Sequence, residues 1–165
     1  MFKTNGTLCV IRQGKTSNKK IAQANEKIVQ TYHFSRGQFD VAQGKTSMQE
    51  FFSHDADVCM DCPFAVSNGA KLSACYTHKV MQYSGFVSML RSIGKETKWD
   101  DIPELNADIE RDILAMCNRK YIRFGTYGEP SLMPYELASS MVAAVVALVF
   151  AAMIYFRTMS DLTTM

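Results

Sequence analysis

Three of the five cysteines lie within one short stretch of the chain. Two residues separate Cys59 from Cys62, twelve separate Cys62 from Cys75, and two more separate Cys75 from His78. A gap of two residues lets a turn direct two donors at one ion, and the longer loop brings the second pair round to it. The C-x2-C-x12-C-x2-H pattern therefore predicts a tetrahedral metal site in which Cys59, Cys62, Cys75 and His78 are the ligands.

Two kinds of metal centre fit these residue types. Zinc bound by all four side chains would form a closed structural site. An iron–sulfur cluster held by the three cysteines alone would leave one iron open to a small ligand. His54, five residues before Cys59, is a further candidate ligand. The spacing does not choose between zinc and a cluster, and inert cysteines that cluster by chance are the third alternative.

A second group of candidate residues runs from Arg123 to Pro130, directly after an apolar segment that predicts a strand. Its carboxylate could hydrogen-bond the amine or the ribose of a ligand, its arginine could contact an anion, and its tyrosine could stack on a ring. A tight turn without any ligand is the alternative. The residues predicted to bind a cofactor are Arg123, Gly125, Tyr127, Gly128 and Glu129.

These two motifs resemble those of a loose group of uncharacterised phage-encoded proteins, with a CP…CY cysteine motif, a helix pair and a strand that ends in R-x-G-x-x-G-[DE]. The resemblance covers roughly residues 54–140 and is carried by Cys62-Pro63, Cys75-Tyr76 and Arg123 to Glu129. The order is similar to the first part of a radical-SAM-like barrel. The resemblance implies that three cysteines hold a four-iron cluster and that a Gly-Glu strand end meets the amine of S-adenosylmethionine. The cysteine spacing here differs from the C-x3-C-x2-C of that group.

The pentapeptide Gln-Gly-Lys-Thr-Ser occurs twice, at 13–17 and 43–47. Neither copy is a phosphate-binding P-loop, because Cys9 and Phe39 stand where that motif needs its first glycine. We interpret both copies as polar turns, and the second is expected to cap a helix. The net charge of +2 does not by itself indicate nucleic-acid binding. The candidate phosphate contacts are Lys15, Lys19, Lys20, Arg36 and Lys45.

Strands and helices alternate along the chain in the order expected of an α/β protein. We therefore predict a small single α/β domain over residues 1–135, with a short, mainly parallel sheet flanked by helices. In such folds the loops at the carboxyl ends of the strands line the site. The expected strands are 7–12, 31–34, 38–42 and 121–124, and the expected helices are 21–30, 47–52, 75–93, 103–117 and one that starts near Pro134.

Residues 137–156 carry no charge over a length that just spans the hydrocarbon core of a bilayer. The segment 136–157 is therefore either a membrane anchor or a hydrophobic helix buried against the sheet, with 158–165 as a tail. The N-terminus has no signal-peptide pattern, and clustered cysteines are typical of a reducing compartment. We expect a cytoplasmic protein of the host cell, with attachment to the inner membrane as the alternative.

Three functional hypotheses follow from these patterns. The first is a phage-type metal-binding protein with zinc or an iron–sulfur cluster, related to a radical-SAM-like enzyme that acts on a nucleotide or another small molecule. The second is a non-catalytic zinc module that binds nucleic acid or protein. The third is a tail-anchored accessory protein of a membrane. The sequence alone names no substrate.

Overall fold

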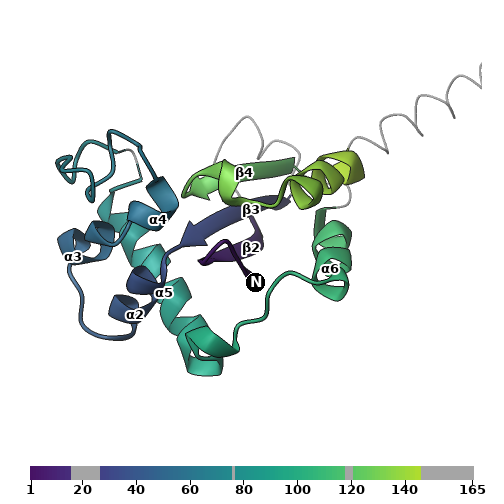
Figure 1. The fold of residues 1–165 in the computed structure, drawn as a ribbon, viewed down its shortest axis with the longest axis horizontal. Helices are drawn as coiled ribbons and strands as arrows, with labels where there is room; N and C mark the ends of the chain where they lie inside the picture. The colour runs from purple at the N-terminus through teal and green to yellow at the C-terminus, as the bar shows by residue number, and fades with distance from the viewer. Residues whose placement is uncertain (16–26, 76, 118–120, 146–165) are drawn as a thin grey trace, which may run out of the picture.

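The computed structural model describes residues 1–15, 27–75, 77–117 and 121–145 of the chain (Figure 1). Its centre is a four-stranded sheet in the order β1-β2-β3-β4. The strands are β1 (Phe2–Thr4), β2 (Thr7–Lys15), β3 (Lys27–Phe34) and β4 (Tyr121–Tyr127). The pairs β1–β2 and β2–β3 are antiparallel, whereas β4 lies parallel to β3.

The predicted α/β class is therefore confirmed, but the prediction of a mainly parallel sheet is wrong. Within the described chain, several helices separate β3 from β4, and a long connection of this kind allows two neighbouring strands to run parallel. Strands β1 and β2 are joined by Asn5 and Gly6, whose φ angles are 48° and 74°. An Asn-Gly pair with two positive φ angles makes a tight hairpin, and a hairpin pairs its strands antiparallel.

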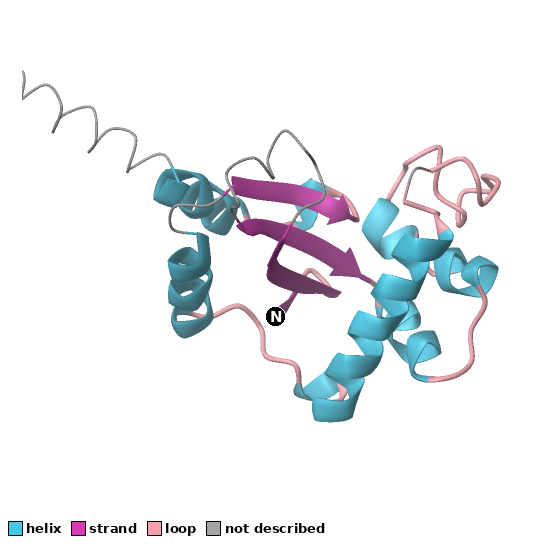
Figure 2. Ribbon diagram, turned by 180° about the vertical axis from the view of Figure 1, so that it is seen from behind, coloured by secondary structure: helices cyan, strands magenta, loops and turns pink. Residues whose placement is uncertain are grey.

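In space, helices lie on both sides of the central strands (Figure 2). Most helices of the described chain lie between β3 and β4 in sequence. In order these are α2 (Arg36–Gln43), α3 (Met48–Ser53), α4 (Ala56–Cys59), α5 (Val80–Glu96), the short η1 (Trp99–Asp101) and α6 (Ala107–Cys117). After β4 come η2 (Pro130–Leu132) and a helix over residues 135–145. Ser47 and Glu50 form the predicted capping box at the start of α3, which fixes where that helix begins.

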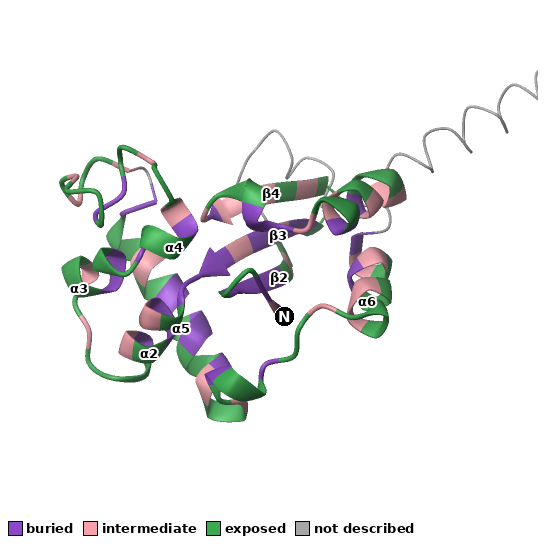
Figure 3. Ribbon diagram, viewed as in Figure 1, coloured by how far each residue is buried: buried purple, intermediate pink, exposed green. Residues whose placement is uncertain are grey.

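Alternating side chains of the sheet enter two separate apolar clusters. The strands β2 and β3 are largely buried (Figure 3). Leu8 and Val10 of β2 point to the face covered by α2, α3 and α5, where Phe34, Phe51 and Leu90 are buried. The residues between them point to the opposite face, which is covered by α6 and helical residues 135–145. There the buried residues include Phe2, Cys9, Ile11, Val29, Ile113 and Leu137. Both faces of the sheet are thus covered.

Three local predictions are corrected by this arrangement. Residues 38–42 belong to helix α2 instead of a strand, because Ser35 and Gln38 form a capping box at its start. Residues 27–30 belong to β3 instead of a helix. Gly94 does not end α5, which continues to Glu96. A Cβ atom at this position would clash with the Gln43 side chain, so the glycine lets α5 pack closely on α2.

The start of the long apolar segment packs in the core. Leu137 and Met141, one helical turn apart, are 1% and 0% exposed against the second face of the sheet. Within the described part of the chain, no helix has both the length and the apolar character needed to cross a bilayer. The anchor predicted for 137–156 lies mostly outside the described residues, as does the tail 158–165.

Candidate metal centre

Cys59 and Cys62 are brought together by the end of a short helix. Cys59 is the last residue of α4, and Met60 leaves the helix with a φ of 47°. The backbone N–H of Cys62 then donates to the Cys59 carbonyl at 3.0 Å. The Asn68 amide holds this turn from the other side, because its Nδ2 donates to the carbonyls of Met60 and Cys62 at 2.8 and 3.0 Å. The two-residue gap therefore makes the compact turn that the sequence predicts.

A buried carboxylate, which the sequence analysis did not single out, fixes the loop between the cysteine pair and Cys75. Asp55 is 0% exposed, and its two oxygens accept hydrogen bonds from the backbone N–H groups of Val66 and Ser67, each at 3.0 Å. These bonds tie the start of α4 to the middle of the loop. Asp55 thus positions the cysteine-bearing segment, and its only sequence signal is an acidic residue one position before the helix.

The end of β4 has an irregular path that brings the glycine turn to the cysteines. Gln30 pairs with Arg123, but Tyr32 pairs with Tyr127, so β4 carries two extra residues against β3. Gly125 lies in this bulge at a φ of 59°, where its freed N–H donates to the Thr31 hydroxyl at 2.9 Å. Glycine suits this position, since other residues are strained at positive φ.

One hydrogen bond joins this turn to the cysteine helix. The backbone N–H of Glu129 donates to the carbonyl of Val58 at 2.7 Å, one residue before Cys59. Next to this bond is a cavity of about 230 Å³. It is lined by Cys59, Cys62, Cys75, Thr77, Gly125, Tyr127, Gly128, Glu129 and Pro130. Two motifs some fifty residues apart in sequence therefore meet at one site.

His78, the predicted fourth ligand, has other partners. Its Nδ1 lies 3.1 Å from the Leu72 carbonyl oxygen, its Nε2 lies 4.0 Å from Asp55 Oδ2, and its ring packs on Phe52 at a centroid distance of 4.1 Å. The side chain is 1% exposed and is absent from the lining of the cysteine cavity. In this arrangement both ring nitrogens face protein atoms, so His78 is not directed at the cavity that the three cysteines share.

Four of the five residues predicted to contact a cofactor line the cysteine cavity, namely Gly125, Tyr127, Gly128 and Glu129. Tyr127 is also part of the core, because it is 1% exposed and its hydroxyl accepts a hydrogen bond from Gln38 Nε2 at 2.5 Å. Arg123 lies elsewhere, since it is exposed and lines a different cavity together with residues of β2, β3 and α5.

The electrostatic surroundings of the cysteines are anionic. Burial, followed by the nearby acidic groups of Asp55, Cys62, Cys75 and Glu129, raises the pKa of the Cys59 thiol to about 12. The Cys75 sulfur lies 3.0 Å from the Thr77 hydroxyl. A bound metal cation would instead lower the pKa of the thiols, because a metal stabilises the thiolate form of its ligands.

The donor set fits a soft metal centre in its chemistry, although its atoms are not fully assembled. Three thiols converge on one cavity, and thiolates favour zinc and iron–sulfur clusters. Among the described residues, no three Cys, His, Asp or Glu side chains already stand in ligating positions. Such a site would therefore close as it binds, because metal binding and local folding are coupled in small thiolate sites.

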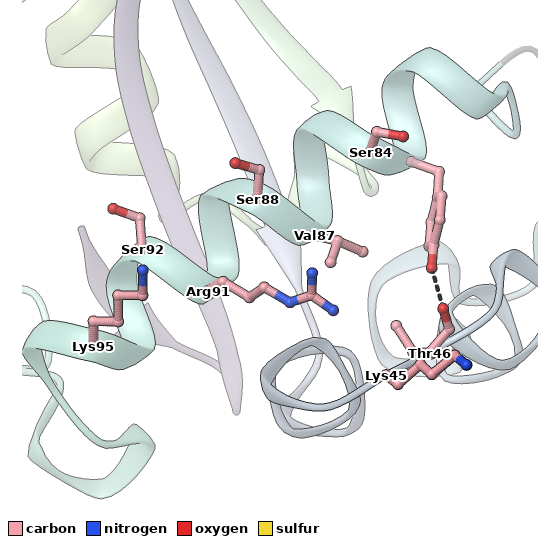
Figure 4. A pocket seen from close by; sticks show the side chains of 9 residues that line it. Lys45, Thr46, Ser84, Val87, Ser88, Arg91, Ser92 and Lys95 are labelled. Atoms are coloured by element: carbon pink, nitrogen blue, oxygen red, sulfur yellow. Dashed lines mark hydrogen bonds between the residues drawn. The ribbon is translucent and has the colours of Figure 1, made fainter.

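The predicted phosphate contacts do not form one basic surface within the described chain. Arg36 is paired with Asp100 at 3.2 Å and with Asp40 at 3.7 Å. Lys45 lines a separate cavity along α5 (Figure 4). The side chain of Lys15, at the end of β2, and the residues Lys19 and Lys20 lie outside the part that is described.

No protein-family model, curated protein or solved structure matches this chain. The function is therefore inferred from the residues and their geometry.

A buried histidine beside the glycine turn gives a prediction about pH. His33 is 0% exposed, neither ring nitrogen has a hydrogen-bond partner among the described residues, and burial lowers its pKa from 6.5 to about 4. The unfolded chain takes up a proton below pH 6.5 while the folded chain does not, so stability falls as the pH drops from 6.5 towards 4 and then levels off. We expect the free energy of unfolding to fall by about 2 kcal/mol between about pH 7 and pH 5.

The variant His33→Phe tests this assignment, because it removes the titrating group and keeps a ring of similar shape. Urea unfolding at several pH values is expected to show a clearly shallower decline with falling pH than in the parent protein. A smaller decline should persist, since burial also lowers the pKa of His78. A His33→Phe protein that loses stability on acidification as steeply as the parent would contradict the assignment.

Proposed function

We propose that the chain is a metal-binding protein in which Cys59, Cys62 and Cys75 hold zinc or an iron–sulfur cluster. The observation that carries the proposal is the shared cavity, which combines the three thiols with Glu129 and the glycine turn. Three thiolates leave one coordination position for a further ligand. When bound, such a centre would supply an electrophilic metal position beside Glu129.

The position of His78 favours a three-thiolate centre over the closed four-ligand zinc site. Recruiting His78 would remove its ring from Asp55, Leu72 and Phe52, where it is buried. Glu129 is an exposed carboxylate on the rim of the cavity, so it is free to accept a hydrogen bond from an amine or hydroxyl of a ligand. The chain's own contribution is thus to hold the metal and to orient a ligand at the open position.

The volume of the cysteine cavity limits the size of the ligand that it can enclose. Pockets for whole small molecules range from about 300 to 1,000 Å³. A cavity of about 230 Å³ suits a metal centre together with only one end of a ligand. If S-adenosylmethionine is the cofactor, as the sequence resemblance implies, Glu129 would accept from its amine and most of the molecule would lie outside this cavity.

Metal analysis of anaerobically purified protein tests the proposal directly. We expect either iron and sulfide with a brown colour, or one zinc per chain in a colourless protein. Cys59→Ala, Cys62→Ala and Cys75→Ala are each expected to lower the metal content about tenfold, because every thiolate contributes to a small site. Cys117→Ala is the matched control, since this cysteine is buried in the second core cluster, away from the cavity.

His78→Gln separates the three-thiolate centre from the four-ligand site. The variant is expected to keep the metal stoichiometry of the parent, and sulfur-edge or metal-edge X-ray absorption should count only thiolates as protein ligands. Loss of metal in a folded His78→Gln protein, judged by circular dichroism, would favour the closed zinc site. Metal content that is unchanged in all three cysteine variants would contradict metal binding by these residues.

A further inference from the structure

We propose that a second cavity, between strands β2 to β4 and helix α5, binds a nucleotide through its phosphate groups. The cavity has a volume of about 360 Å³, within the range of small-molecule sites. Its residues lie outside the cysteine cavity, so the proposal does not depend on the metal. Strand β4 contributes to both cavities, with Arg123 and Thr126 in this one and Gly125 and Tyr127 in the other.

The sheet register places two arginines at the ends of one row. Arg12 pairs with Gln30 across β2 and β3, and Gln30 pairs with Arg123 across β3 and β4. Paired residues present their side chains on the same face of a sheet. Neighbouring strands lie about 4.8 Å apart, so the two arginines start about 10 Å from each other with the Gln30 amide between them.

The two guanidinium groups are not neutralised by the described part of the protein. Neither Arg12 nor Arg123 has an ion pair there, whereas Arg36 and Arg111 are each paired with carboxylates. None of the residues that line the cavity is acidic. Unpaired guanidinium groups present several N–H donors in a planar fork, a geometry that matches phosphate oxygens.

Neutral polar groups beside the arginines are also available to a ligand. The Tyr32 hydroxyl donates to Gln30 Oε1 at 2.5 Å, which leaves the Gln30 amide N–H groups to donate into the cavity. The Thr126 hydroxyl is buried and has no hydrogen-bond partner among the described residues. A buried hydroxyl without a partner is rare in proteins.

The wall next to the charges is apolar and aromatic. Tyr32 and Phe86 pack edge to face with their ring centroids 6.1 Å apart, and Met89 continues the surface along α5. Aromatic rings and methionine form favourable contacts with a planar base. Guanidinium groups beside such a wall are complementary to a ligand with both phosphate and an aromatic ring, and a nucleotide has both.

The other basic cavity is a poorer match for the same ligand. It runs along α5 and contains Lys45, Arg91 and Lys95 (Figure 4). Arg91 is already used to hold α5 to α2, because its guanidinium donates to the carbonyls of Ala42 and Gly44. The α5 side of this cavity includes three serines, Ser84, Ser88 and Ser92. It therefore provides a matched control site on the same helix.

Isothermal titration of the full chain with ADP, pyrophosphate and adenosine tests the proposal. ADP is expected to bind, and Arg12→Gln and Arg123→Gln should each weaken its binding about tenfold. Lys45→Gln, which removes one charge from the control cavity, should change it less than about twofold. Tyr32→Leu should weaken ADP more than pyrophosphate, because only ADP carries a base to stack.

A short oligothymidylate in the same titration separates two sources of this chemistry. If the oligonucleotide binds more tightly than ADP, and Arg12→Gln and Arg123→Gln abolish this binding, the ligand is a nucleotide within a strand. If ADP binds more tightly, the ligand is a free nucleotide. The proposal is overturned if ADP and the oligonucleotide both fail to bind at millimolar concentration. Equal weakening by Lys45→Gln and Arg123→Gln would also overturn it, by showing non-specific attraction to positive charge.

Discussion

Replacing Asp55 with alanine is expected to lower the free energy of unfolding by about 3–4 kcal/mol. The carboxylate is 0% exposed and accepts from Val66 and Ser67, and its Oδ2 lies 4.0 Å from His78 Nε2. Alanine would leave a buried N–H without a partner and would open space beside His78. Hydrogen bonds to a charged group are also stronger than those between neutral groups.

The measurement is urea unfolding of the metal-free protein, with Asp57→Ala as the control. Asp57 belongs to the same short helix but is exposed, so its loss should cost less than about 1 kcal/mol. Asp55→Ala should also loosen the loop that carries Cys75, which would weaken metal binding in a protein that is still folded. Equal stability losses in the two variants would show that Asp55 does not hold this loop.

Gly128→Ala is the second large effect, with an expected loss of about 3 kcal/mol in the free energy of unfolding. Gly128 has a φ of 80°, and an added Cβ would lie 2.7 Å from His33 Cβ and 3.2 Å from the His33 carbonyl oxygen. The close neighbours are a buried side chain and the backbone of β3, neither of which can move at low cost. Alanine would therefore add a steric clash to the strain of a positive φ.

Gly69→Ala separates these two contributions. Gly69 has nearly the same φ, 82°, but no atom lies within 4 Å of the position that a Cβ would take. Its replacement should cost only about 1 kcal/mol, the strain of the left-handed conformation alone. Thermal unfolding of the two variants in parallel gives the comparison, and similar losses for both would show that the contact with His33 is not tight.

The errors in the sequence-based elements have local physical causes. Ile28 and Val29 are adjacent and both buried, because β3 is covered on its two faces, and adjacent apolar residues resemble a helical pattern. The helix α2 could have been predicted from Ser35 and Gln38, which have the spacing of a capping box. Pro103 does not begin α6, since its carbonyl accepts from the Lys3 N–H at 2.8 Å and holds the chain beside β1.

Features that depend on hydrogen bonds between residues close in sequence could be predicted from the sequence alone. The turn from Cys59 to Cys62, the capping box of Ser47 and Glu50, and the glycine turn after β4 each lie within a few residues. Their geometry follows from residue type and spacing, so the candidate cysteines and Glu129 could be named before the fold was known.

The way in which these local features come together depends on the tertiary structure. The parallel pairing of β3 with β4 joins segments about ninety residues apart, and its bulge sends Arg123 to one cavity and Glu129 to another. Burial of Asp55 and Phe52 gives His78 partners other than the three cysteines. Such choices depend on the packing of both faces of the sheet, a property of the whole chain that no local spacing contains.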